Sequence, residues 1–217
     1  MFDHILRRGK DRLLAPLVRV AGSRLHPNLI SVAAAVVGLA AAVALAAGAR
    51  NLAATLWVGN RIVDGFDGAV ARATGQVSDY GGYLDLMLDV VVYSAIPIGF
   101  ALYRPEPGVL LSITFLLAAY YVNITSWLYL SVLFERYRQT GGDDGVARSL
   151  TSIEMPRGLV EGAETIVAYL ALILFSSYAV IILLVTAAAV FVGAAQRVIW
   201  AAVRFRRGGH QVPRWGS

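Results

Sequence analysis

The sequence predicts an all-α integral membrane protein with six transmembrane helices, preceded by an amphipathic helix at the membrane surface. Two observations carry this prediction. The chain of 217 residues is 58% hydrophobic and only 15% charged, whereas soluble globular domains carry about 25% charged residues. Six apolar segments are also long enough to cross a bilayer, which takes about 20 residues. In chain order these segments are 28–47, 52–73, 80–103, 109–134, 159–175 and 178–203.

The first 25 residues differ from these spans, because arginines interrupt their apolar residues. They lack both the continuous apolar core and the small-residue cleavage site of a secretory signal. Their apolar residues recur instead at helical spacing, which favours an amphipathic helix on the cytoplasmic membrane surface, bent or interrupted at Pro16. A basic leader that frays is the alternative. Three segments are therefore expected: the surface helix 1–25, the membrane domain 26–205 and a basic cytoplasmic tail 206–217.

The distribution of charge predicts the orientation of the spans. Six spans place both termini on one side, together with the basic residues of the polar 4–5 connection at about 135–156. The opposite side receives only Arg50 and Arg104. Since basic residues mark cytoplasmic loops, both termini are expected in the cytoplasm. The net charge of +5 borders apolar spans, so it does not indicate nucleic-acid binding.

Four carboxylates lie inside the second and third spans, where ionisable groups are costly and need a functional reason. Asp64 and Asp67 are three residues apart, and Asp85 and Asp89 are four apart, so each pair shares a helix face. The short connection between these spans makes them antiparallel neighbours whose pairs can face each other. The chain has no cysteine and only three separated histidines. Clustered carboxylates of this kind favour Mg²⁺ or Mn²⁺, which suit phosphate chemistry.

Small residues surround the carboxylates and allow a ligand to approach the backbone closely. Arg72 lies at the same end, and a guanidinium there suits a phosphate group. The pattern D-x2-D-G-x2-A-R-x8-G-x3-D-x3-D runs from Asp64 to Asp89, with all eight specified positions matched. It resembles the signature of the CDP-alcohol phosphotransferase family. The stretch 26–31 is similar to the proline-asparagine start of the first span in that family, so the resemblance covers nearly the whole chain.

The resemblance implies an enzyme of phospholipid biosynthesis. It would transfer a phosphatidyl group from CDP-diacylglycerol, or a related CDP-lipid, to a polar alcohol and release CMP. Asp64, Asp67, Asp85 and Asp89 would bind two ions of Mg²⁺ or Mn²⁺, and Asp89 would also be the general base. The family further suggests a homodimer. The residues implied in contact with the cytidine diphosphate are Asn28, Ser31, Gly68, Ala71, Arg72 and Gly81.

The acceptor alcohol is less well indicated. Arg197 and Arg157 resemble residues that hold the acceptor phosphate in the branch that makes phosphatidylinositol phosphate, although Tyr129 stands where that branch has a lysine. The pair Asn60-Arg61 and the stretch 157–165 resemble a poorly characterised bacterial inner-membrane branch. Glycerol 3-phosphate and inositol phosphate are the expected acceptors. The candidate acceptor-binding residues are Arg148, Arg157, Glu161, Glu164 and Arg197.

Other interpretations remain open at this point. The aspartates could form a structural ion-pair network with Arg61 and Arg72. A cation transporter would use an intramembrane acidic site without nucleotide, but it leaves the glycine-alanine-arginine spacing unexplained. An inactive family member could serve as a membrane scaffold, and an intramembrane prenyltransferase also uses aspartate-rich helices. Arg157 and Arg197 could extend toward the interface, and acidic residues such as Glu164 are favourable at a helix start.

Overall fold

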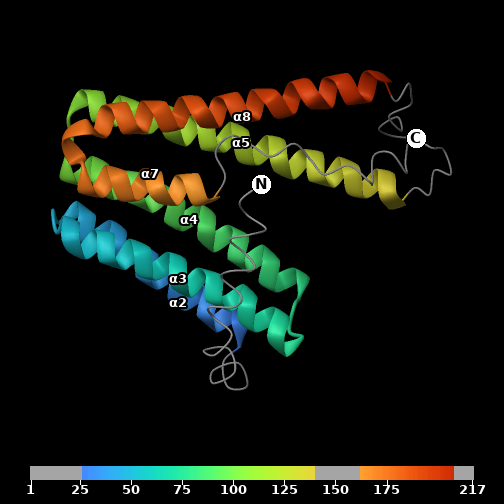
Figure 1. Cartoon of the computed structure of the whole chain (residues 1–217), viewed down its shortest axis with the longest axis horizontal. Helices are drawn as coiled ribbons and strands as arrows, with labels where there is room; N and C mark the ends of the chain where they lie inside the picture. Colours follow the sequence, from blue (N-terminus) through green and yellow to red (C-terminus); the bar gives the residue numbers. More distant parts are fainter. Residues whose placement is uncertain (1–25, 140–161, 208–217) are drawn as a thin grey trace. The chain divides into compact units, whose positions relative to one another are not determined.

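The computed structural model describes residues 26–139 and 162–207, and all regular structure in these ranges is helical. The expected surface helix, the loop before Pro156 and most of the basic tail lie outside the described residues. The described ranges contain six α-helices, labelled in Figure 1, and a short 3₁₀ turn between the last two. Their bounds are α2 Pro27–Ala46, α3 Arg50–Thr74, α4 Asp79–Tyr103, α5 Pro107–Gln139, α7 Gly162–Leu174, the turn Ser176–Tyr178 and α8 Ala179–Arg207.

Each expected span coincides with a helix to within a few residues, except that α5 and α8 extend beyond the apolar segments. Within the described ranges, four segments are long and apolar enough to cross a membrane: α2, α4, the part of α5 from 107 to 135, and residues 176–203. In α3 the charged residues interrupt the apolar sequence, and α7 has 13 described residues. Four candidate spans are therefore observed, and the count of six stays a prediction.

The helices form two compact units. In the described part of the chain, the first unit contains residues 26–113 and 163–182. It therefore holds α2, α3, α4, nearly all of α7 and the first turns of α5 and α8. The second unit contains the remaining lengths of α5 and α8. All four aspartates of the sequence pattern belong to the first unit.

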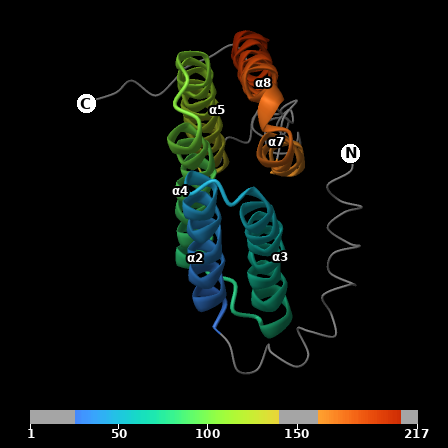
Figure 2. The same cartoon turned by 90° about the vertical axis from the view of Figure 1, so that its left-hand side faces the viewer.

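Glycine allows α2 and α4 to pack at very short range. A Cβ atom placed on Gly38 of α2 would lie 2.6 Å from Cγ1 of Val92, and one placed on Gly99 of α4 would overlap the backbone of Ala42. Small residues at such positions let helix backbones approach closely in membranes. Figure 2 shows α2, α3 and α4 side by side, joined by short connections at alternate ends.

The connection between α3 and α4 is a tight turn with a cap on each side. Gly75 ends α3 in the left-handed conformation, with φ of 69°, which glycine adopts without steric cost. Ser78 begins α4, and its Oγ accepts a hydrogen bond of 3.1 Å from the backbone N–H of Gly81, as a helix N-cap should. The two aspartate-bearing helices therefore run antiparallel, as the sequence predicted, and both pack against α2.

A proline inside α4 ties α7 to the same helices. Pro97 has no N–H, so the carbonyl of Tyr93 four residues earlier cannot receive its usual helical hydrogen bond. The hydroxyl of Tyr169 on α7 donates to this carbonyl at 2.7 Å. Nearby, Nε1 of Trp57 on α3 donates to the carbonyl of Ile166 at 3.1 Å. Polar groups of α3, α4 and α7 thus satisfy one another where little water is available.

Ser176 accepts hydrogen bonds from two arginines. It lies at the end of the first unit opposite to the aspartates. Nη1 of Arg50 donates to its Oγ at 3.0 Å, and Nη1 of Arg104 donates to its carbonyl at 2.7 Å. Arg104 also forms an ion pair of 2.6 Å with Glu106. The start of α3, the end of α4 and the turn before α8 are therefore joined at one residue.

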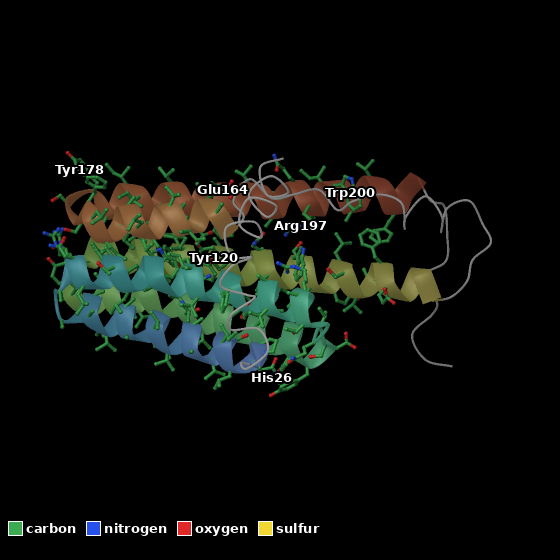
Figure 3. All side chains as sticks on the ribbon, turned by 60° about the horizontal axis from the view of Figure 1, so that its bottom comes forward. His26, Tyr120, Glu164, Tyr178, Arg197 and Trp200 are labelled. Atoms are coloured by element: carbon green, nitrogen blue, oxygen red, sulfur yellow. The ribbon has the colours of Figure 1, made fainter. Side chains whose placement is uncertain are left out.

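In the second unit, α5 and α8 share a buried polar contact. Arg197 of α8 is 5% exposed, and its Nη1 donates to Oδ1 of Asn123 at 3.0 Å and to the carbonyl of Asn123 at 3.2 Å. Figure 3 labels Arg197 and Trp200 on α8. The ring of Trp200 packs edge-on against Phe134, with centroids 5.8 Å apart.

Candidate active site

Three carboxylates from two helices converge in the first unit. Asp64 and Asp67 of α3 and Asp85 of α4 each present an oxygen atom, and these atoms lie within 4.8 Å of one another. Asp67 is buried, whereas Asp64 and Asp85 are half-buried. The turn at Gly75 brings the two helices together with these residues at matching heights. We call Asp64, Asp67 and Asp85 the carboxylate cluster.

The start of α2 closes one side of this cluster. Oγ of Ser31 donates a hydrogen bond of 2.5 Å to Oδ2 of Asp67, and it also lies 3.3 Å from the carbonyl of Pro27. The backbone N–H of Gly68 donates to the other oxygen of Asp67. Asp67 is thus fixed in orientation from α2 and from its own helix.

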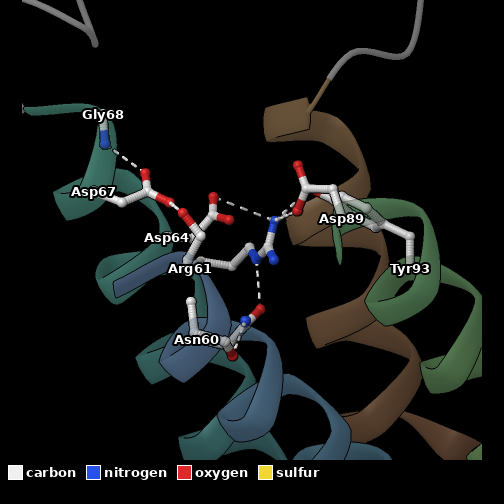
Figure 4. A network of polar contacts seen from close by, with 9 residues as sticks. Asn60, Arg61, Asp64, Asp67, Gly68, Asp89 and Tyr93 are labelled. Carbon is white, nitrogen blue, oxygen red and sulfur yellow. Dashed lines mark hydrogen bonds and ion pairs between the residues drawn. The ribbon is translucent and has the colours of Figure 1, made fainter. Parts of the chain in front are cut away.

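The fourth aspartate has a different partner. Asp89 is not among the three residues whose oxygens lie within 4.8 Å of one another. Its Oδ1 instead accepts a hydrogen bond of 3.0 Å from Nη1 of Arg61, which also lies 3.6 Å from Oδ2 of Asp64 (Figure 4). Arg61 therefore stands between Asp89 and the carboxylate cluster.

Arg61 is itself held on several sides and is only 9% exposed. Its Nε donates to Oδ1 of Asn60 at 2.7 Å, and Nη1 lies 3.0 Å from the hydroxyl of Tyr93. The amide of Asn60 in turn donates to the carbonyl of Ala34 on α2 at 2.7 Å. The guanidinium carbon lies 5.0 Å from the centroid of Trp57 and 4.8 Å from that of Tyr93, within the range of cation–π attraction.

A pocket of about 280 Å³ opens beside the carboxylate cluster. Asp67 and Asp85 line it, so the pocket and the cluster are continuous. All six residues that the family resemblance implied for the cytidine diphosphate also line it: Asn28, Ser31, Gly68, Ala71, Arg72 and Gly81. Sequence reasoning did not assign Pro27, Gln76, Val77, Ser78 and Gly82, which complete the lining.

The glycines of this pocket have close neighbours. A Cβ atom on Gly81 would lie 3.1 Å from Oδ1 of Asn28 and 3.1 Å from Oγ of Ser78. A Cβ atom on Gly68 would lie 3.2 Å from Nη1 of Arg72, so this guanidinium extends back along α3 over the pocket wall. Ser78 has a sequence signal that could have identified it, because a serine before an acidic residue at a helix start is typical of an N-cap.

The predicted acceptor residues are not gathered in this way. Arg148, Arg157 and Glu161 lie outside the described residues. Glu164 is exposed in the first turn of α7 in the first unit, and Arg197 belongs to the second unit. Their assignment to an acceptor stays a prediction.

The donor set of the carboxylate cluster suits a divalent metal ion. Its three ligand residues offer only carboxylate oxygens, half-buried or buried and close enough to share one ion. Hard oxygen donors favour Mg²⁺ or Mn²⁺ over the softer metals that thiolates and imidazoles bind.

Comparison with known proteins decides the family. The model of the CDP-alcohol phosphatidyltransferase family matches residues 24–205. The chain belongs to this family. The inner membrane protein YnjF of Escherichia coli is 31% identical over 179 residues, which cover 82% of this chain and 84% of that protein. The archaetidylinositol phosphate synthase of Pyrococcus horikoshii is 30% identical over 102 residues, covering 45% and 54% respectively.

Solved structures share the fold. The phosphatidylinositol phosphate synthase PgsA1 of Mycobacterium tuberculosis, with CDP-DAG bound, is 19% identical with a TM-score of 0.66, over 87% of this chain and 92% of that one. The same protein in complex with manganese and citrate gives a TM-score of 0.63 at 19% identity, over 88% and 87%.

These findings confirm the family that the sequence pattern indicated. The chain is a CDP-alcohol phosphatidyltransferase family enzyme and an integral membrane protein, homologous to an inner membrane protein of Escherichia coli. They do not favour the cation transporter or the prenyltransferase. The ion-pair interpretation of the aspartates holds only in part, because Arg61 pairs with Asp64 and Asp89, while Asp64 also converges with Asp67 and Asp85.

Proposed function

We propose that this enzyme transfers a phosphatidyl group from CDP-diacylglycerol, or a related CDP-lipid, to a polar alcohol and releases CMP. The observation that carries the proposal is the shared boundary of the pocket and the carboxylate cluster. A pocket lined by the six implied nucleotide contacts meets the cluster at Asp67 and Asp85. The likeness in fold to a synthase with CDP-DAG bound supports the same donor.

Asp64, Asp67 and Asp85 would hold a divalent cation, Mg²⁺ or Mn²⁺. The manganese complex of the Mycobacterium tuberculosis synthase supports this choice of metal class. Such an ion, when bound, neutralises a pyrophosphate and polarises the phosphorus that is attacked. A second ion, with Asp89 among its ligands, stays a prediction.

The pocket residues would bind the nucleotide by size and by charge. Gly81 and Ala71 present little or no side chain, so a diphosphate can approach the backbone of α3 and α4. Arg72 carries a guanidinium that can bond phosphate oxygens in pairs. Asn28 and Ser31 bring polar groups from the start of α2 to the same pocket.

The reaction itself is a displacement at phosphorus. The acceptor oxygen forms a bond to the phosphorus that bears the lipid, and the bond from this phosphorus to the bridging oxygen breaks. CMP leaves with that oxygen. The hydroxyl proton passes to a carboxylate oxygen of Asp89, the general base. The lipid chains stay in the bilayer during the exchange.

We propose a phosphorylated acceptor, either glycerol 3-phosphate or inositol phosphate. The printed name of the Pyrococcus horikoshii relative, an archaetidylinositol phosphate synthase, supports the second. Arg197 is a buried cation of the kind that binds a phosphate. A homodimer, with both termini and the active site on the cytoplasmic side, belongs to the same proposal.

The test is CMP release by the purified protein in lipid, with CDP-diacylglycerol, Mg²⁺ or Mn²⁺, and a panel of acceptors. The panel contains glycerol 3-phosphate, inositol phosphate, inositol, serine and ethanolamine. We expect CMP with one phosphorylated acceptor and a loss of at least a hundredfold in Asp89→Asn. CMP release with a neutral acceptor alone would overturn the choice of acceptor. Absence of both CMP release and metal-dependent binding of CDP-diacylglycerol would overturn the proposed function.

A further inference from the structure

One arginine joins carboxylates that belong to two different helices. Nη1 of Arg61 lies 3.0 Å from Oδ1 of Asp89 on α4 and 3.6 Å from Oδ2 of Asp64 on its own helix. Asp64 belongs to the carboxylate cluster, and Asp89 is the expected ligand of a second ion. Both helices pack against α2. The shared donor, more than direct packing of α3 on α4, therefore sets the spacing of these two carboxylates.

The guanidinium that makes this bridge is itself fixed. Nε of Arg61 donates to Oδ1 of Asn60 at 2.7 Å, and the amide of Asn60 donates to the carbonyl of Ala34 on α2 at 2.7 Å. The rings of Trp57 and Tyr93 lie 5.0 and 4.8 Å from the central carbon of the guanidinium. A planar guanidinium held along one edge can direct its remaining N–H groups, whereas a flexible ammonium cannot.

Both bridged carboxylates keep access to a metal ion. The side chain of Arg61 is 8% exposed, whereas those of Asp89 and Asp64 are 30% and 25% exposed. The hydrogen bond from Arg61 uses Oδ1 of Asp89, so Oδ2 can bind an ion. Hydrogen-bonded partners of this kind orient the carboxylates that bind a metal, and their loss typically lowers metal affinity or activity about 10- to 100-fold.

We propose that Asn60 and Arg61 are positioning residues for the metal ligands Asp64 and Asp89. Asn60 orients the guanidinium from α2, and the guanidinium holds the two carboxylates at a fixed separation across α3 and α4. The inference rests on the proposed function, which assigns a divalent cation to these carboxylates. It gives a role to the pair Asn60-Arg61, which precedes the family pattern in the sequence and is not part of it.

The charge of Arg61 acts in the opposite direction from its hydrogen bonds. A positive charge close to Asp64 repels a divalent cation, so a neutral substitution would remove the repulsion and the orientation together. Arg61→Lys separates the two effects, because lysine keeps the charge and loses the planar fork. Asn60→Ala is a second variant, which keeps Arg61 and removes the hydrogen bond that supports it.

The experiment compares the unsubstituted full-length protein with these two variants in lipid. Mn²⁺ affinity is measured by electron paramagnetic resonance without substrate, and kcat and KM are measured from CMP release at saturating Mn²⁺. For Arg61→Lys we expect Mn²⁺ to bind about tenfold more weakly and kcat to fall about 10- to 100-fold. For Asn60→Ala we expect both quantities to fall about three- to tenfold. The KM for CDP-diacylglycerol should stay within about threefold, because neither residue lines the pocket.

A pair that only supported the packing of the helices would give a different result. Movement of α3 and α4 away from α2 would widen the pocket, which all three helices line, so KM would rise together with the loss of Mn²⁺ affinity. Arg104→Lys is the matched control. It makes the same substitution in the same unit, about 20 Å along α4 from Asp89, and it is expected to change none of the three constants.

A Mn²⁺ affinity in Arg61→Lys within about twofold of the unsubstituted protein would overturn the inference, and so would a rise in KM as large as the fall in Mn²⁺ affinity. If Arg61→Lys does not fold, Asn60→Ala decides by the same two criteria. Failure of the proposed function is distinguishable, because it would appear as absent CMP release by the unsubstituted protein. The Mn²⁺ affinities would still show whether Asn60 and Arg61 position the ligands.

Discussion

Oγ of Ser31 on α2 donates a 2.5 Å hydrogen bond to Oδ2 of Asp67 on α3. This contact orients a buried carboxylate of the cluster from a helix that carries none of the four aspartates. Both residues also line the pocket proposed for the nucleotide. The start of α2 is therefore part of the site and does more than cover it.

Ser31→Ala should weaken the binding of metal and CDP-lipid together. A hydrogen bond to a charged group contributes about 1.5–3 kcal/mol, so the KM for CDP-diacylglycerol and the Kd for Mn²⁺ should each rise about tenfold. The control is Ser112→Ala, since Ser112 is also buried and its hydroxyl donates to the local carbonyl of Gly108 in its own helix. A Ser31→Ala enzyme with both constants within twofold of the unsubstituted protein would contradict this role.

Asp67→Asn should lower Mn²⁺ affinity at least tenfold and CMP release at least a hundredfold, because the cluster loses a charged ligand at its most buried position. Calorimetric titration with Mn²⁺ and a CMP assay measure the two effects. Asp79→Asn is the matched control, since Asp79 is an exposed acid in the first turn of α4 and not part of the cluster. Equal effects of the two substitutions would mean that Mn²⁺ binds elsewhere.

Gly81→Ala should impair nucleotide binding more than folding. The added methyl group would lie 3.1 Å from Asn28 and from Ser78 and would reduce the space in the pocket. We expect the KM for CDP-diacylglycerol to rise about three- to tenfold, with a thermal midpoint in detergent close to that of the unsubstituted protein, corresponding to a loss of about 1 kcal/mol or less. Gly59→Ala is the control, because nothing lies within 4 Å of a methyl group there. A normal KM in Gly81→Ala would argue against contact between Gly81 and the ligand.

Tyr169→Phe should destabilise the first unit, because the carbonyl of Tyr93 before Pro97 loses its donor. Hydrogen bonds inside membrane proteins contribute about 0.6 kcal/mol on average and up to about 1.7 kcal/mol. A carbonyl freed by proline has no helical substitute, so we expect a loss of about 1 kcal/mol, visible as a lower thermal midpoint. Tyr178→Phe, at an exposed tyrosine, supplies the comparison. Identical midpoints for the two variants would show that Tyr93 finds another donor.

Much of the site was predictable because it is local in sequence. The spacings within 64–72 and 81–89 place the carboxylates on two helix faces, and the short turn fixes the pairing of those helices. Four of the six nucleotide contacts that the family resemblance implied lie in these two stretches, whereas Asn28 and Ser31 line the same pocket from α2 and were expected from the resemblance alone. The boundaries of the apolar helices also follow from composition, since apolar runs and their flanking turns are read directly from the chain.

The division of the aspartates into three and one could not be predicted. It depends on the register of α3 against α4, which sets Arg61 beside Asp89 across 28 residues of sequence. The spacing rule treats Asp85 and Asp89 alike, whereas in the structure they have different partners. The hydrogen bond from Tyr169 to the carbonyl of Tyr93 could not be predicted either. Pro97 shows that this carbonyl lacks a backbone donor, but not which helix supplies another one.

Two arginines restrain one end of the first unit by donating hydrogen bonds to Ser176. Arg50 and Arg104 join the start of α3 and the end of α4 to the turn before α8, about 20–25 Å along α3 from the carboxylate cluster. Together with the contact between Arg61 and Asp89 nearer the cluster, these hydrogen bonds hold α3 and α4 to each other at two levels along the first unit.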